Sequence, residues 1–253
     1  MKNKIIIVVL ILLGLNHLSA NVFTVNQEKA FLNIMLGTTL DLANNMYNKK
    51  NVDTLTEIEL STISRNDVSF LDRWAIRGYE KDIDDAGSYL VLISLGATSL
   101  FSLWDDPYTW DNIMVMGEIL VVQTAINQWT KSLTLRNRPY VYDEGTDLEL
   151  KTDKDSRFSF YSRHTSTAFA IAVYNHYYQH YTTNSWLMIA LPYGTATLVG
   201  VSRILSGSHF PTDVLVGALA GSVSSYLICK SHNSRATRAV YIGYNTINFQ
   251  VRF

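Results

Sequence analysis

Residues 186–229 read WLMIALPYGTATLVGVSRILSGSHFPTDVLVGALAGSVSSYLIC. Two apolar runs, Trp186–Val201 and Val214–Cys229, flank a short connection that carries an arginine, a histidine and an aspartate. Both runs are rich in Leu, Ala, Val and Ile and are longer than a usual core strand, so we expect helices. The stretch therefore predicts a helical scaffold that presents polar side chains at one of its ends.

Three earlier segments have the same apolar character. They are Tyr89–Trp104, Ile113–Trp129 and Thr165–Tyr178. We therefore expect an all-α fold, a bundle of five to six apolar helices. The C-terminal residues Ala239–Phe253 differ, because aromatic and apolar residues partly alternate with polar ones, which predicts a short β-like tail.

The bundle could lie in a membrane or form a soluble core. The apolar segments have about 14 to 17 residues each, fewer than the ~20 that comfortably cross a bilayer, and the mean hydropathy is only +0.05. The basic residues Lys230, Arg235 and Arg238 in the tail fit the rule that cytoplasmic segments are positively charged. We expect the membrane-embedded arrangement, with a soluble bundle as the alternative.

The N-terminus has the features of an export signal. Met1–Lys4 is short and basic, and Ile5–Leu15 is an apolar run of the length found in signal peptides. Cleavage after Ala20 would leave the large Leu18 three residues before the junction, so an uncleaved anchor is the alternative. We divide the chain into residues 1–20 (signal peptide or anchor), 21–87 (an extramembrane helical region), 88–230 (the helical core) and 231–253 (the tail).

Composition narrows the classes of function. The 253 residues, 47% of them hydrophobic, are enough for one domain with a sizeable core. A formal net charge of -1 provides no basic field for binding nucleic acid. Cys229 is the single cysteine, which excludes an intramolecular disulfide and a cysteine-cluster metal site. The sequence says nothing about the oligomeric state.

Three polar clusters at the ends of the apolar segments carry the candidate chemistry. Lys131, Arg138 and Arg203 supply an ammonium and two guanidinium groups, which suit the dispersed charge of a phosphoryl group. Without carboxylate partners these cations would repel one another, and an anion would relieve that repulsion. Ser162 adds a hydroxyl, and helix N-termini near His164 and Asp213 add backbone N–H donors.

Two histidines could perform catalysis on that anion. His209 lies four residues before Asp213, so the carboxylate could accept one ring N–H and leave the other nitrogen as a nucleophile. His164 could protonate the leaving alcohol. The acidic residues and histidines have no metal-ligand spacing, so we expect catalysis without a metal or any other cofactor.

This pattern resembles the signature of the type 2 phosphatidic acid phosphatase superfamily, which also includes bacterial class A acid phosphatases and vanadium haloperoxidases. The signature consists of Lys, six residues, Arg-Pro; then Pro-Ser-Gly-His; then Ser-Arg, five residues, His, three residues, Asp. The chain matches the first and third parts without a change of spacing, at Lys131, Arg138 and Pro139 and at Ser202, Arg203, His209 and Asp213. The resemblance covers about residues 111–229.

The second part departs from the signature, because Tyr161 replaces the proline and Arg163 replaces the glycine. The resemblance implies that His209 forms a phosphohistidine, that Asp213 orients it, and that His164 acts as acid and then as base. It also implies a set of residues that hold the phosphoryl oxygens. These are Lys131, Arg138, Ser162, Arg163 and Arg203.

The resemblance implies a metal-independent phosphatase that hydrolyses a phosphate monoester or diphosphate, with a lipid phosphate as the expected substrate. We expect an exported protein, either in the inner membrane with its site facing the periplasm or soluble in the periplasm as a broad-specificity acid phosphatase. Two further alternatives are a vanadium-dependent haloperoxidase and a membrane protein that binds phospholipid without turnover.

Overall fold

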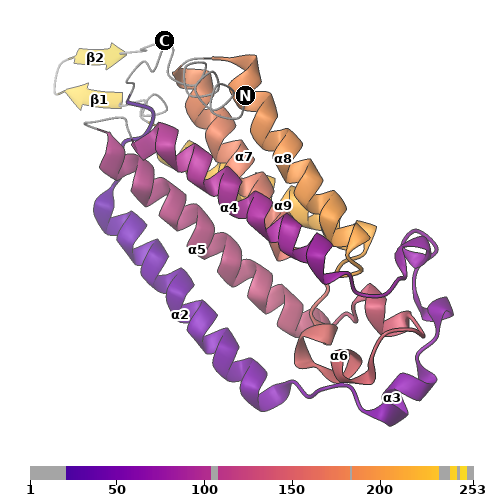
Figure 1. Cartoon of the computed structure of the whole chain (residues 1–253). Helices are drawn as coiled ribbons and strands as arrows, with labels where there is room; N and C mark the ends of the chain where they lie inside the picture. The colour runs from indigo at the N-terminus through magenta and orange to yellow at the C-terminus, as the bar shows by residue number, and fades with distance from the viewer. Residues whose placement is uncertain (1–20, 104–107, 183, 234–239, 244–245, 250–253) are drawn as a thin grey trace.

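The computed structural model of the chain describes residues 21–103, 108–182, 184–233, 240–243 and 246–249. Six long helices in this part of the chain run along one another as a bundle (Figure 1). They are α2 (Gln27–Asn51), α4 (Lys81–Leu103), α5 (Thr109–Thr134), α7 (Arg163–Tyr181), α8 (Trp186–Leu205) and α9 (Pro211–Ser231). The short helices α3 (Glu57–Thr62) and α6 (Leu148–Thr152) lie together at one end of the bundle (Figure 1).

All five apolar segments form helices, which confirms the expected helical bundle. The helices are longer than the apolar runs, because further residues continue them at one or both ends. In α5 the helix extends beyond Trp129 to Thr134, and Leu135 ends it in the left-handed conformation at φ 46°. The six long helices have 19 to 26 residues, or about 28 to 39 Å, enough for the ~30 Å hydrocarbon core of a bilayer.

Close packing of α7 against α9 depends on small residues. The buried residues of α9 recur every fourth position, at Asp213, Gly217, Gly221, Ser225 and Cys229. A Cβ atom at Gly221 would lie 1.9 Å from the Ser166 carbonyl oxygen of α7, which only glycine avoids. The absence of a side chain at Gly217 and Gly221 therefore sets the distance between the two helices.

Helix α2 lies along α5 (Figure 1), and two of its asparagines form hydrogen bonds with α5. Asn33 donates to Glu118 over 2.8 Å, and the buried Asn44 donates to Ser132 over 2.8 Å. The N-terminal region 21–87 thus contains a long helix, which packs directly on the helical core. Its outer face exposes large apolar side chains, such as Met46 (73% exposed).

The tail contains a hairpin in which β1 (Val240–Gly243) pairs antiparallel with β2 (Thr246–Phe249), as its alternating pattern predicts. The expected export signal, residues 1–20, lies outside the described residues. Among those residues, α8 and α9 are long and apolar enough to cross a membrane by length and composition.

Candidate active site

The three polar clusters meet at the end of the bundle where α5 ends and where α7 and α9 begin. Lys131 lies in the last turn of α5, His164 in the first turn of α7, and Arg203 in the last turn of α8. His209 lies in the short connection between α8 and α9. Helix ends and the connection after α8 position these side chains, so Lys131 and His209, far apart in the sequence, line one site.

A cavity of about 350 Å³ opens at this end of the bundle. It collects most of the side chains that the sequence singled out, together with others from outside the motifs. The predicted residues in its lining are Lys131, Arg138, Arg163, His164, Arg203 and His209. Ser162 and Asp213 are fully buried and do not line it. The Ser162 hydroxyl instead caps α7, accepting from the Thr165 hydroxyl at 2.9 Å.

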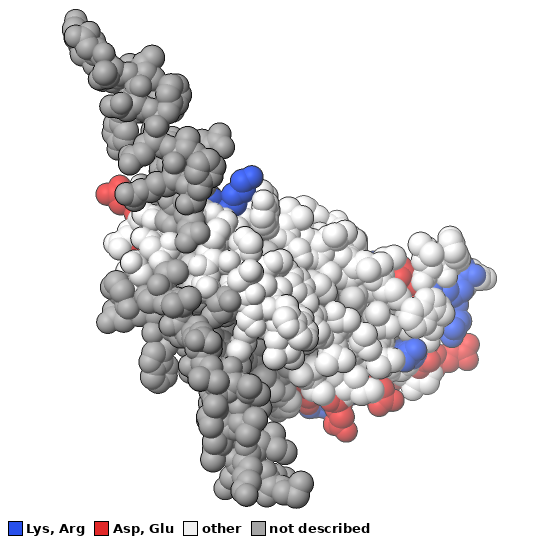
Figure 2. All heavy atoms as spheres, turned by 90° about the horizontal axis from the view of Figure 1, so that it is seen from above, with Lys and Arg blue, Asp and Glu red and all other residues white. Residues whose placement is uncertain are grey.

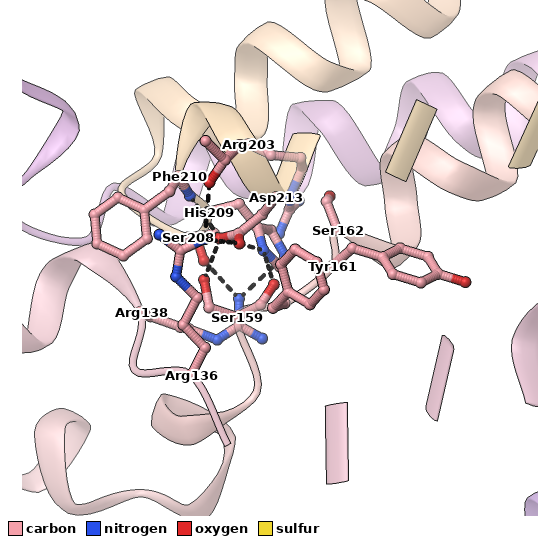
Figure 3. A network of polar contacts seen from close by, with 12 residues as sticks. Arg136, Arg138, Ser159, Tyr161, Ser162, Arg203, Ser208, His209, Phe210 and Asp213 are labelled. Atoms are coloured by element: carbon pink, nitrogen blue, oxygen red, sulfur yellow. Dashed lines mark hydrogen bonds and ion pairs between the residues drawn. The ribbon is translucent and has the colours of Figure 1, made fainter. Parts of the chain in front are cut away.

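His209 is 1% exposed, and its two ring nitrogens have different surroundings. Nδ1 lies 2.7 Å from the Ser159 carbonyl oxygen (Figure 3). A carbonyl can only accept, so Nδ1 carries the proton and the electron pair is on Nε2, which lies 3.4 Å from Nη1 of Arg138. Burial, together with Arg138 and Lys131, holds the pKa of His209 well below its usual value. His209 is therefore neutral in the tautomer that a nucleophile at Nε2 requires.

Asp213 does not accept the ring N–H directly, which differs from the sequence-based expectation. Its Oδ2 lies 3.9 Å from Nδ1 of His209. The same oxygen accepts from the Ser159 hydroxyl at 2.6 Å and from the Phe210 N–H at 2.9 Å. The spacing of four residues does bring Asp213 beside His209, but the first turn of α9 and Ser159 occupy its oxygens.

The two site arginines have carboxylate partners, so the expectation of unpaired cations was wrong. Arg138 pairs with Asp155 at 2.6 Å, and Arg203 pairs with Asp84. Neither carboxylate belongs to the motifs. The Lys131 ammonium donates to the Phe158 carbonyl at 2.8 Å, and burial, followed by Arg138, holds the pKa of Lys131 well below its usual value. The arginines are thus held in place by the protein itself.

His164 contacts α4, where its Nε2 lies 3.2 Å from the Ser88 hydroxyl. Burial, Arg203 and Arg163 lower the pKa of His164 to about 3. In the protein by itself His164 is therefore neutral at neutral pH. Negative charge beside it, such as that of a phosphoryl group, would favour its protonated form.

Metal-ligating side chains are not gathered at the site. Within the described part of the chain, no group of three or more His, Cys, Asp or Glu residues could hold a metal ion. Four cationic side chains line the cavity, Lys131, Arg138, Arg163 and Arg203, together with the carboxylates of Asp84, Asp153 and Asp155.

Residues 112–236 match the model of the PAP2 superfamily. This segment belongs to the PAP2 superfamily. It contains every residue of the cavity that the sequence singled out, from Lys131 to His209.

Two curated proteins are similar to part of the chain. The bacitracin transport permease protein BcrC of Bacillus licheniformis is 29% identical over 134 residues, covering 52% of this chain and 62% of the relative. The lipid A 1-phosphatase of Porphyromonas gingivalis is 38% identical over 72 residues, covering 28% of this chain and 16% of the relative. The chain thus spans less than two thirds of the length of each.

Two solved structures are also similar. Aquifex aeolicus LpxE has a TM-score of 0.49 at 23% identity, covering 66% of this chain and 99% of LpxE. A transmembrane PAP2-type phosphatidylglycerolphosphate phosphatase from Bacillus subtilis has a TM-score of 0.47 at 19% identity, covering 76% and 93% of the two chains.

The PAP2 segment does not complete the site alone. Asp84 at the start of α4 precedes the segment and holds Arg203. The sequence offered no signal for Asp84, Asp155 or the Ser159 carbonyl, because none has a fixed spacing to the motifs. Arg136, by contrast, lies between Lys131 and Arg138 in the sequence, and this position could have marked it as a site residue.

Proposed function

We propose that this protein is a metal-independent phosphatase that hydrolyses a phosphate monoester or diphosphate through a phosphohistidine. One observation carries the proposal: His209 lines a cavity with four cationic side chains, and Nδ1 donates to the Ser159 carbonyl. The electron pair for attack on phosphorus is therefore on Nε2, beside Nη1 of Arg138. Nucleophilic catalysis needs an electron pair, a fixed ring and compensation for the charge of the phosphoryl group. The cavity offers all three.

In the first step, Nε2 of His209 attacks phosphorus and the P–O bond to the leaving group breaks. His164 gives its proton to the departing oxygen, and Lys131, Arg138 and Arg203 hold the phosphoryl oxygens. In the second step, water attacks the phosphohistidine, His164 takes a proton from that water, and the P–N bond breaks. Inorganic phosphate leaves, and His209 is neutral again.

The fixed arginines favour the transition state over the ground state. Arg138 donates through Nε to the Asp155 carbonyl at 2.9 Å and through Nη1 to the Ser208 carbonyl at 3.0 Å. Arg203 donates through Nη1 to the Asp84 carbonyl at 2.9 Å. Donors that are already oriented need not reorganise as charge develops on the phosphoryl oxygens, which is the main source of electrostatic catalysis.

We propose a lipid phosphate as the substrate and a membrane as the location. One relative is named a lipid A 1-phosphatase, and the outer faces of α8 and α9 expose large apolar side chains, such as Leu198 (58%) and Leu219 (66%). Figure 2 shows a broad part of the surface with few charged side chains. A site at the end of such a bundle would lie at the bilayer surface, and we propose that it faces the periplasm.

The outer face of α2 also exposes large apolar side chains. Phe31, Leu32 and Met35 on its outer face are 58%, 64% and 51% exposed. The hydroxyls of Thr38 and Thr39 donate to backbone carbonyls four residues earlier, so they need no water. We propose that α2 spans the bilayer with the other long helices rather than belonging to an extramembrane region.

The test is a hydrolysis screen of the detergent-purified protein with phosphatidic acid, a polyprenyl diphosphate, lipid A and p-nitrophenyl phosphate, with and without EDTA. We expect EDTA to leave activity unchanged and His209→Ala to abolish it. The matched control is His180→Ala, an exposed histidine at the opposite end of α7, which should keep wild-type activity. Full activity in His209→Ala would refute the mechanism.

A further inference from the structure

We infer that Asp72 and Arg136 are positioning residues, which hold Asp213 and Ser159 so that His209 points Nε2 into the cavity. The inference rests on the proposed phosphatase function and extends it to two residues outside the superfamily signature. Asp72 also lies outside the PAP2 segment, in a region without any recognisable motif.

Arg136 joins the two carboxylates on either side of it. Its Nη1 donates to Asp213 at 2.5 Å and to the Thr212 hydroxyl at 2.8 Å, and its Nη2 donates to Asp72 at 2.8 Å. The guanidinium lies over the Phe210 ring, 4.5 Å from its centroid. Arg136 thus contacts Phe210, Thr212 and Asp213, which follow His209 closely in the sequence, and it also contacts Asp72.

Asp72 fixes the same turn from the other side. It is 1% exposed. Its Oδ1 accepts from the Thr212 N–H at 3.0 Å, and its Oδ2 accepts from the Thr212 hydroxyl at 2.6 Å. A carboxylate that caps the first turn of a helix is stabilised there by unpaired N–H groups. Asp72 therefore anchors α9 at its N-terminus, and with it the connection that carries His209.

A short path of hydrogen bonds leads from Arg136 to the nucleophile. The Arg136 carbonyl accepts from the Ser159 N–H at 2.9 Å, and Asp213, held by the Arg136 guanidinium, accepts from the Ser159 hydroxyl at 2.6 Å. The Ser159 carbonyl then accepts from Nδ1 of His209 at 2.7 Å. Displacement of Asp213 or Ser159 would turn the imidazole ring, and misplacement of a reacting atom by about 1 Å can lower a rate about 100-fold.

The charges of the group also suit the reaction. Asp72, Arg136 and Asp213 together carry two negative charges and one positive charge, and Asp213 lies 3.9 Å from Nδ1. The imidazole gains positive charge when Nε2 bonds to phosphorus, and the net negative charge stabilises it. Removal of the Asp72 charge would leave Asp213 fully neutralised by Arg136.

Phosphate binding should not depend on this group. Asp72, Arg136 and Asp213 do not line the cavity, whereas Lys131, Arg138 and Arg203 do. A defect in positioning should therefore lower kcat and leave KM nearly unchanged, since KM reports mainly on groups that bind substrate and transition state alike.

The experiment compares Asp72→Asn, Arg136→Gln and the double variant in hydrolysis of p-nitrophenyl phosphate, with vanadate as a competitive inhibitor. We expect kcat to fall about 10- to 100-fold in each single variant, while KM and the vanadate inhibition constant stay within about threefold of wild type. The double variant should be no slower than the slower single variant, because residues that act as a unit are not additive.

The matched control is Asp82→Asn, which makes the same change at an exposed carboxylate in the first turn of α4 and should keep wild-type kcat. Arg136→Lys replaces Arg136→Gln if the latter does not fold. Wild-type kcat in a folded Asp72→Asn variant would overturn the inference, as would a loss of vanadate binding in proportion to kcat. A wild-type protein without phosphatase activity would overturn the proposed function itself.

Discussion

At the scale of single residues, the proposed role of His209 as nucleophile depends on the Ser159 carbonyl as well as on the imidazole ring itself. The imidazole can attack only from the nitrogen without a proton, and a backbone carbonyl at 2.7 Å determines which nitrogen that is. The nearby cations favour the neutral ring. The reactivity of His209 thus depends on its neighbours.

A change of Arg163 tests the proposed role of His164 as the acid. Its positive charge contributes to the lowered pKa of His164, after burial and Arg203. In Arg163→Gly the pKa of His164 should rise, so His164 stays protonated to higher pH and the alkaline limb of kcat moves to higher pH. The pH profile of p-nitrophenyl phosphate hydrolysis measures the shift.

Arg163→Lys is the matched control for that change, because it keeps the charge and should keep the wild-type pH profile. An equal shift in the lysine and glycine variants, or a shift to lower pH in Arg163→Gly, would contradict the assigned role of the charge.

At the scale of helices, α7 and α9 approach closely because α9 presents glycines to the α7 backbone. In Gly221→Ala the new methyl group would meet the Ser166 carbonyl, and the two helices would have to separate. Overpacking of this kind lowers stability by about 1–3 kcal/mol. Because His164 lies in the first turn of α7, we also expect activity to fall.

Thermal unfolding in detergent measures this effect, and Gly194→Ala is its control. A Cβ atom at Gly194 would have no neighbour within 4 Å among the described residues, so that variant should unfold at the wild-type temperature or above. Equal unfolding temperatures for Gly221→Ala and wild type would refute the packing argument.

At the scale of the whole molecule, the inward polar and outward apolar surfaces suit a lipid surrounding. On α2, Asn33 and Asn44 pair with Glu118 and Ser132 of α5, while many of the exposed side chains are large and apolar. Soluble bundles show the reverse arrangement. The bundle thus exposes apolar side chains on the surface that water would cover in a soluble protein.

Membrane fractionation tests this arrangement. We expect the protein to stay in membranes washed with high salt or carbonate and to be released by detergent, because the exposed leucines of α8 and α9 would contact acyl chains. A peripheral membrane protein in the same preparation, released by carbonate, serves as the control. Release of this protein by carbonate would favour the soluble periplasmic phosphatase instead.

The sequence by itself determined the helical scaffold, the β-like tail and the convergence of six side chains on one cavity. Hydrophobic runs indicate helices, so the scaffold could be predicted. The spacings of Lys131 to Arg138 and of Arg203 to His209 each cover one helix end and the connection after it, which keeps these side chains near each other. Only the tertiary structure decided which groups hold those side chains. Asp72 meets Thr212 across 140 positions and Asp84 meets Arg203 across 119, and no local spacing records a contact that arises when distant helices pack.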